Sequence, residues 1–315
     1  MTTPFFCLLT HESILAIQGV DSKKFLQGQI TCNLNYLTTE QSSLGASCTP
    51  KGRMVSSFRL LEQATDNYLL CLDKNLFEKQ LADFKKYAIF SKVTLEKADE
   101  QWVRFGLQAT PEELSFLELE TPQQANQVKQ HHSQQYFLIN ISEQRYELWI
   151  TNSHVATIKQ LLIQHLMEKP LNDWLLGQIR AGIGQVFLEN TEEFVPQMIN
   201  LQSIGGVSFK KGCYLGQEIV ARMQYLGKLK RHLYRFSLDH QDLPNIGADL
   251  FSTVHTSSVG RVVLAAQTED HKIELLAVTQ DDATTNELWL QDNQTNHLKL
   301  LSIPYEVNPE EEIKY

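Results

Sequence analysis

Apolar residues recur along the chain in short runs, and turn signals separate one run from the next. Even the longest runs, such as residues 68–72, fall far short of the roughly 20 residues that cross a bilayer. Runs of this length predict a mixture of short strands and helices. A chain of 315 residues, 42% of them hydrophobic, is long and apolar enough for two or three domains with packed cores.

The first third of the chain is expected to form a mixed α/β unit. Residues 44–48 and 54–61 are apolar runs separated by Pro50-Lys51-Gly52, a turn signal, and this pattern predicts a hairpin. The other apolar runs predict strands at 14–17, 68–72 and 92–95. Helical spacing and a possible N-cap at Asp21 predict helices at 21–29 and 76–87.

The middle of the chain repeats this pattern, and the last part differs from it. Strands are expected at 102–107, 136–141 and 146–150, and helices at 154–167 and 171–183, with a polar loop over 112–135. From residue 228 onward, short alternating runs predict a small antiparallel barrel. The predicted domains are an α/β domain at 1–98, completed by part of 200–226, a second α/β domain at 99–200, and a β-barrel at 227–315.

The N-terminus and the cysteines indicate a cytoplasmic protein without a membrane partner. No basic segment precedes the first apolar residues, and Glu12 soon interrupts them, so a signal peptide is not expected. The five cysteines are scattered and form no C-x-x-C pair; they are Cys7, Cys32, Cys48, Cys71 and Cys213. This pattern argues against a disulfide framework, a zinc site or a self-contained iron–sulphur ligand set, although a cluster shared with another protein stays open.

The charge is distributed unevenly. The net charge of −9 argues against a protein that coats nucleic acid. Between residues 208 and 235, however, seven basic residues stand against Glu218 alone: Lys210, Lys211, Arg222, Lys228, Lys230, Arg231 and Arg235. This basic stretch is either a solvated face or a local site for an anion.

The densest stretch of the sequence is residues 204–218, with four glycines in fifteen residues. A helix is predicted over 217–225, so Cys213 comes just before a helix N-terminus and just after Lys210 and Lys211. Both features favour a thiolate on Cys213. The alternative is a buried, inert cysteine between two turns.

This stretch carries a specific resemblance. Lys211-Gly212-Cys213-Tyr214-Leu215-Gly216-Gln217-Glu218 is similar to the signature K-G-C-Y-x-G-Q-E of the YgfZ family, which is related to the glycine-cleavage T-protein aminomethyltransferase. Five further segments extend the resemblance from about residue 14 to Arg235: 24–29, 50–53, 86–90, 194–197 and 200–201.

The resemblance implies an α+β fold of three domains, two of folate-binding α/β type and one C-terminal antiparallel β-barrel. It implies that the cofactor is tetrahydrofolate or a derivative, bound in a cleft between the two α/β domains. Trp174 stands where the bacterial family places a tryptophan near the folate, and Glu12 or Ser13 stands where some members have a second one. The signature residues Lys211, Tyr214, Gln217 and Glu218 are expected to bind the cofactor, with Cys213 as the reactive thiol.

The family also implies a role in tRNA modification through the upkeep of iron–sulphur client enzymes, such as those that thiomethylate tRNA. One departure concerns catalysis. The T-protein carries paired aspartates where this chain has Ser56 and Ser57, and a hydroxyl cannot replace a carboxylate as proton acceptor near pH 7. We therefore expect a folate-binding accessory protein and no aminomethyl transfer. Two alternatives stay open: a one-carbon transferase with Cys213 as nucleophile, and direct tRNA binding by the basic stretch.

Overall fold

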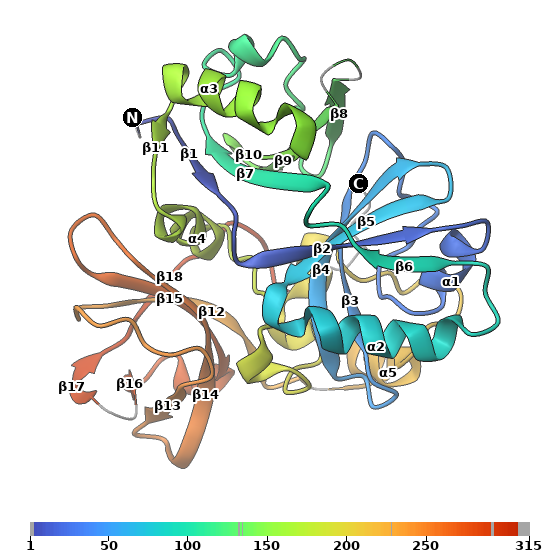
Figure 1. Cartoon of the computed structure of the whole chain (residues 1–315). Helices are drawn as coiled ribbons and strands as arrows, with labels where there is room; N and C mark the ends of the chain where they lie inside the picture. Colours follow the sequence, from blue (N-terminus) through green and yellow to red (C-terminus); the bar gives the residue numbers. More distant parts are fainter. Residues whose placement is uncertain (1–2, 132, 134, 228, 291–292, 308–315) are drawn as a thin grey trace.

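The computed structural model of the chain describes residues 3–131, 133, 135–227, 229–290 and 293–307. Within them the chain is a mixed α/β protein with many strands and few helices, and its strands form three sheets (Figure 1). In the described part of the chain, no helix is long and apolar enough to cross a membrane.

The first sheet has five antiparallel strands in the order β3-β4-β5-β2-β6. They are β2 (Glu12–Gln18), β3 (Ser43–Cys48), β4 (Met54–Ala64), β5 (Asn67–Asp73) and β6 (Thr94–Lys97). Helices α1 (Ser22–Gln27) and α2 (Phe77–Ala88) pack on one face, where the rings of Phe25 and Phe84 lie 5.6 Å apart. The predicted hairpin is confirmed, because β3 and β4 pair from Ser43 and Leu60 to Cys48 and Met54.

The second sheet has six strands in the order β11-β1-β7-β10-β9-β8. They are β1 (Phe5–Leu8), β7 (Trp102–Gln108), β8 (Val128–His131), β9 (Tyr136–Ser142), β10 (Arg145–Thr151) and β11 (Met167–Glu168). Helix α3 (Val155–His165) covers one face of it (Figure 1). The other face packs on the first sheet through a shared apolar layer that includes Trp149 and Leu69.

The third sheet is a curled antiparallel sheet of seven strands in the order β17-β16-β13-β14-β15-β12-β18. They are β12 (Arg231–Leu238), β13 (Asp249–Ser252), β14 (His255–Gln267), β15 (Ile273–Gln280), β16 (Leu288–Leu290), β17 (Asn293–His297) and β18 (Lys299–Leu301). Its inner face holds a separate apolar core that includes Phe236 and Leu275.

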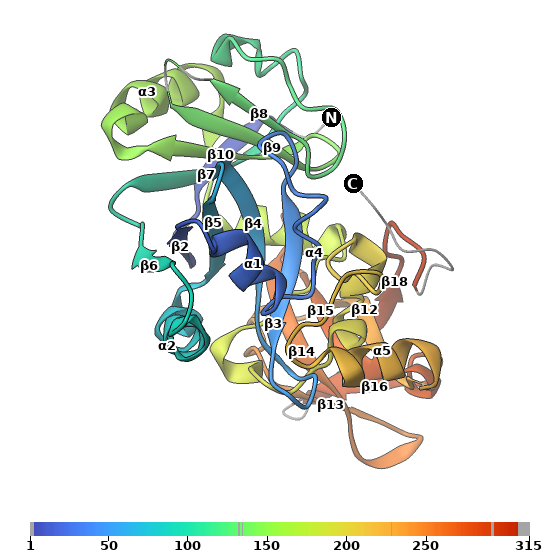
Figure 2. The same cartoon turned by 90° about the vertical axis from the view of Figure 1, so that its right-hand side faces the viewer.

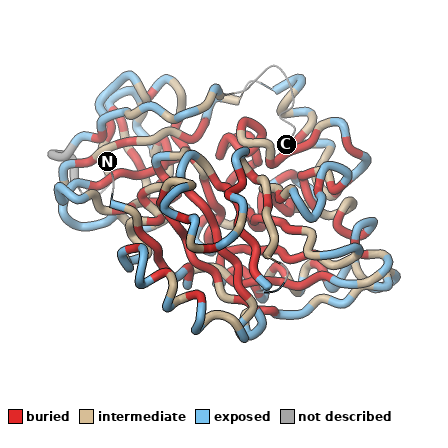
Figure 3. Tube along the Cα trace, turned by 90° about the horizontal axis from the view of Figure 1, so that it is seen from above, coloured by how far each residue is buried: buried red, intermediate tan, exposed pale blue. Residues whose placement is uncertain are grey.

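Two helices and a series of short turns join the sheets. Helix α4 (Leu171–Arg180) lies between the second and third sheets in both Figures 1 and 2, and it packs against β14. Helix α5 (Gln217–Tyr225) follows the glycine-rich stretch. The 3-10 turns between them include Leu188–Asn190, Pro196–Ile199 and Leu201–Ile204. Figure 3 shows the buried part of the trace running through the middle of the molecule, where these elements meet.

The structure differs from the sequence-based expectation at the edges of the second sheet. The predicted loop over 112–135 contains a strand, β8, because Val128–His131 pairs with the neighbouring strand β9. The helix predicted to end at residue 167 ends at His165, and Met167 instead pairs with Phe5 of β1. Strand β1 itself was missed, although it pairs with β7 along its whole length.

Candidate functional site

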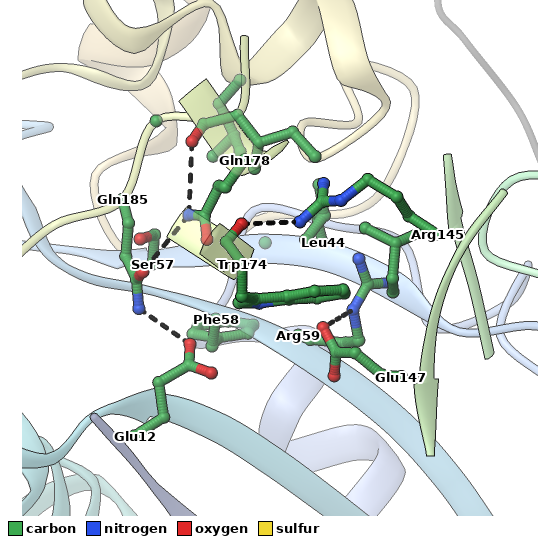
Figure 4. A pocket seen from close by; sticks show the side chains of 15 residues that line it. Glu12, Leu44, Ser57, Phe58, Arg59, Arg145, Glu147, Trp174, Gln178 and Gln185 are labelled. Atoms are coloured by element: carbon green, nitrogen blue, oxygen red, sulfur yellow. Dashed lines mark hydrogen bonds and ion pairs between the residues drawn. The ribbon is translucent and has the colours of Figure 1, made fainter. Parts of the chain in front are cut away.

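A narrow cavity of about 50 Å³ lies where the first two sheets meet α4 (Figure 4). Strands β2 and β4 contribute Glu12, Ser57 and Arg59, and β10 contributes Arg145 and Glu147. Helix α4 contributes Trp174 and Gln178, and the segment after it contributes Gln185. The cavity therefore has one aromatic wall and an unusual number of charged groups for a buried site.

Trp174 is held rigidly in the wall of this cavity. It is only 3% exposed. The guanidinium of Arg145 lies over its ring, 4.1 Å from the ring centroid, and Arg145 Nη2 donates to the Trp174 carbonyl oxygen over 3.0 Å. On β7, Gly106 lies so close that a Cβ there would stand 2.5 Å from two indole carbons. The resemblance places Trp174 near a bound folate, and in the structure its buried ring lines a cavity.

Arg145 contributes a buried guanidinium with an unpaired nitrogen to the cavity wall. Burial lowers the pKa of its guanidinium to about 10. Its Nη1 atom is buried and has no hydrogen-bond partner among the described residues. Gly177 of α4 leaves room for the side chain, since a Cβ there would lie 2.6 Å from Arg145 Nε. An unpaired buried donor is costly, and a ligand acceptor in the cavity would satisfy it.

The other charges form a network that joins the two sheets. Arg104 of β7 donates to Glu12 and to Glu147, each over 2.6 Å, and Arg59 Nε lies 3.4 Å from Glu147. Burial alone would raise the pKa of Glu12, but the Arg104 guanidinium outweighs it and lowers the pKa to about 2. With Arg145, three guanidinium groups face two carboxylates, so this region carries one surplus positive charge.

The two serines of β4 face opposite sides of the first sheet, as neighbouring residues of a strand do. Ser57 lines the cavity, and its hydroxyl oxygen accepts a hydrogen bond from the Val186 backbone N–H over 2.8 Å. Ser56 points to the helix-covered face and donates to Gln80 over 2.6 Å. Strand β4 therefore presents a hydroxyl group to the cavity at this position. The carboxylates that line the cavity are those of Glu12 and Glu147.

The signature residues lie elsewhere. Lys211 is buried and donates from Nζ to the carbonyl oxygens of Ile30 and Cys32, over 2.8 and 2.7 Å. Its ammonium lies 5.1 Å from the centroid of the buried Tyr214 ring. Gln217 begins α5 and Glu218 is exposed. Among the described residues that line the cavity with Trp174, none belongs to the signature. In this structure, Lys211 and Tyr214 anchor the signature loop to the first sheet.

Cys213 is exposed on this loop, whereas Cys7, Cys32, Cys48 and Cys71 are buried. We expect a thiol-alkylating reagent to modify the native protein once, at Cys213, as read by mass spectrometry of its peptides. Burial raises the pKa of Cys48 to about 12, which further protects that thiol. We also expect Cys213→Ala to melt within about a degree of wild type, because an exposed side chain leaves no cavity. Alkylation at a buried cysteine before Cys213 would contradict this.

Lys211 should give the protein a distinctive pH dependence. Burial lowers the pKa of its ammonium to about 8, from an ordinary 10.5. Between these values the unfolded chain binds more protons than the folded one, so this group adds stability as the pH rises from 8 to 10.5, by at most about 3 kcal/mol. We expect urea unfolding to show this rise in wild type relative to Lys211→Met. Parallel pH profiles for the two proteins would contradict it.

The basic stretch is not a single cationic surface. Lys211 is buried, and Arg235 is tied to Glu274 over 2.7 Å. Lys228 lies outside the described residues. The exposed members are Lys210, Arg222, Lys230 and Arg231. Folding therefore turns two of the seven cations to partners within the chain, and the prediction of a local anion site rests on the four exposed ones.

Sequence reasoning missed three charged groups of the cavity, Arg59, Arg145 and Glu147, and also Arg104, which pairs with the cavity carboxylates Glu12 and Glu147. Two of them left a signal in the sequence, since Arg59 and Arg104 interrupt apolar runs that were predicted as strands. A buried charge in a strand needs a partner, and here the partner lies on the other sheet. Gln178 and Gln185 left no such signal, because glutamine is common on exposed surfaces.

Comparison with known proteins adds the fold. No protein-family model matches the chain. The structure of the glycine cleavage system aminomethyltransferase T from Bartonella henselae matches with a TM-score of 0.74 and 12% identity, over 96% of this chain and 86% of that one. The heterotetrameric sarcosine oxidase from Corynebacterium sp. U-96, in complex with pyrrole 2-carboxylate, matches with a TM-score of 0.38 and 10% identity, over 51% of this chain and 83% of that chain. The second likeness is too weak to carry an argument. The first shows that this chain has the fold of aminomethyltransferase T.

Proposed function

We propose that the chain binds a reduced folate, tetrahydrofolate or a derivative, with its pterin beside Trp174, and that the cavity of about 50 Å³ widens to admit the ring. Three observations support this: the fold matches aminomethyltransferase T, the cavity has an aromatic wall, and Arg145 Nη1 offers an unpaired buried donor. The flat pterin would contact Trp174 and Phe58, and its polar edge would meet Arg145, Gln178 and Ser57. Folate supplies a carrier for one-carbon units, and these residues would bind and orient it.

We propose further that the protein does not transfer an aminomethyl group. This rests on the residue at the cavity face of β4, which is Ser57 and not an aspartate. The carboxylates that are present, Glu12 and Glu147, are both paired with Arg104. Carboxylates held by a guanidinium at 2.6 Å are poor proton acceptors. Desolvation alone would raise the pKa of Glu147, but the guanidinium groups of Arg104 and Arg59 outweigh it and lower that pKa.

We therefore expect no ammonia release above background when the protein meets aminomethyl-loaded carrier protein and tetrahydrofolate. Authentic aminomethyltransferase T, assayed with the same loaded carrier, is the positive control. Turnover within tenfold of that control would contradict the proposal and would favour a transferase.

The wider role we propose is that of an accessory protein of the YgfZ type. It would support the assembly or repair of iron–sulphur client enzymes in the cytoplasm, and thereby tRNA modification. Its three sheets would correspond to the domains 1–98, 99–200 and 227–315, except that strand β1 of the first range belongs to the second sheet. The test is a deletion strain assayed for tRNA thiomethylation and complemented with wild type, Arg145→Met and Cys213→Ala. Full complementation by Arg145→Met would contradict a role for the cavity.

A second candidate function rests on the exposure of Cys213. An accessible thiol could act as nucleophile in a one-carbon transferase. Cys213 does not line the cavity, so the first proposal has the stronger support. In the same complementation assay, a transferase of this kind requires that Cys213→Ala fails while retaining wild-type folate affinity, and that purified protein turns over with a folate one-carbon donor.

A further inference from the structure

We propose that a second cavity, on the helix-covered face of the first sheet, binds a neutral carbonyl compound about the size of a nucleobase. Its volume is about 290 Å³, close to the small end of the range for small-molecule sites, roughly 300 to 1,000 Å³. The two cavities share no lining residue in the described part of the chain. Strand β4 separates them, with Ser57 lining the first and Ser56 behind the second.

The floor of this second cavity is a fixed carboxamide. Gln80 of α2 lines the cavity and is only 1% exposed. Its Oε1 atom accepts hydrogen bonds from the hydroxyls of Ser47 and Ser56, over 2.5 and 2.6 Å. Its amide nitrogen has no hydrogen-bond partner among the described residues. Because both serines hold the oxygen, the floor offers N–H donors to a ligand, and the complementary group is a carbonyl oxygen.

The walls and the rim define the rest of the ligand. Phe84, Val55 and Leu215 form apolar walls, which suit a flat or compact apolar body. At the rim, Lys79 pairs with Glu192 over 2.9 Å, and Lys86 pairs with Asp83 over 2.7 Å. These four charges already neutralise one another, so the site supplies no free counter-charge. A charged ligand would be buried without compensation, and a neutral amide or lactam ring fits best.

Three probes of the same shape test this inference: benzamide, benzoate and benzylammonium. In ligand-observed saturation-transfer NMR, we expect benzamide to bind, and in a protein-observed nitrogen-15 spectrum we expect it to shift the side-chain amide signal of Gln80. Benzoate should bind at least about tenfold more weakly because its charge stays unpaired, and benzylammonium should not bind because it lacks an acceptor.

Two variants of the whole chain and one control locate the binding. Gln80→Met should weaken benzamide at least about tenfold by removing the N–H donors. If that variant does not fold, Leu215→Trp, at a partly exposed wall, should fill the cavity and abolish binding. Trp174→Phe, in the other cavity, should leave benzamide binding unchanged. Benzamide that gives no signal, that binds no better than benzoate, or that still binds Gln80→Met or Leu215→Trp would overturn the inference.

Discussion

Replacing Arg104 with methionine should lower the free energy of unfolding by about 3–5 kcal/mol. This is the largest effect on stability that we expect from a single substitution in this chain. Arg104 is 4% exposed and links β2 of the first sheet to β10 of the second through Glu12 and Glu147. Methionine keeps much of the volume and removes the charge, so both carboxylates would stay buried without their main partner. Urea unfolding at pH 7 measures the loss.

The pH dependence separates lost charge from lost packing. In wild type, the pKa of Glu12 is about 2, below its ordinary 4.5, so its contribution to stability is present above pH 4.5 and is lost as the pH falls to 2. In Arg104→Met, burial should raise the pKa of both carboxyls, so the variant loses stability as the pH rises. The gap between the two proteins should therefore widen from pH 4 to pH 7.

An exposed ion pair serves as the control. Lys97→Met removes the contact with Asp99, in which Lys97 is 53% exposed, and should cost less than about 1 kcal/mol at either pH. A loss in Arg104→Met that is the same at pH 4 and pH 7 would show that packing, and not the charge network, accounts for it.

Adding a single methyl group at Gly106 should both destabilise the protein and disturb the cavity. The new Cβ would stand 2.5 Å from two carbons of the buried Trp174 ring, and Trp174 is held on α4 by Arg145. Overpacking of this kind costs about 1–3 kcal/mol. We expect Gly106→Ala to lower the melting temperature by several degrees and to weaken tetrahydrofolate binding at least about tenfold, because the indole must move.

Gly212→Ala is the matched control for this substitution. Its added Cβ meets no atom within 4 Å, so we expect wild-type melting and folate binding. If the two substitutions lower the melting temperature and the folate affinity equally, the position of Trp174 does not determine folate binding. Weak folate binding by Gly106→Ala without a change in its melting temperature would still support the wall, since the indole could shift at little cost to the fold.

The sequence predicted the hairpin of β3 and β4 well because these two hydrogen-bonded strands are close in the chain. The hairpin of β3 and β4 is specified by a local turn at Pro50-Lys51-Gly52. The sequence analysis missed β1, whose partners β7 and β11 are both distant in the chain. Strand β1 pairs with β7, about a hundred residues away, and nothing near Phe5 encodes that contact.

In the candidate site, too, some residues could be found from the sequence and others could not. Trp174 was selected by its place in a resemblance, and it does line a cavity. The signature around Cys213 drew attention to Lys211 and Tyr214, which hold the loop in place through backbone carbonyls and burial. The charge network could not be predicted, because Arg104 meets Glu12 and Glu147 only after two sheets pack together.

The most direct test of the central claim is a calorimetric titration of tetrahydrofolate into wild type, Trp174→Phe, Arg145→Met and Trp289→Phe. Trp289 lies on β16 of the third sheet and is the control for a tryptophan outside the cavity. The account predicts one bound folate per chain, with affinity at least about tenfold weaker in Arg145→Met, measurably weaker in Trp174→Phe, and unchanged in Trp289→Phe. No binding to wild type, or equal affinity in all four proteins, would contradict it.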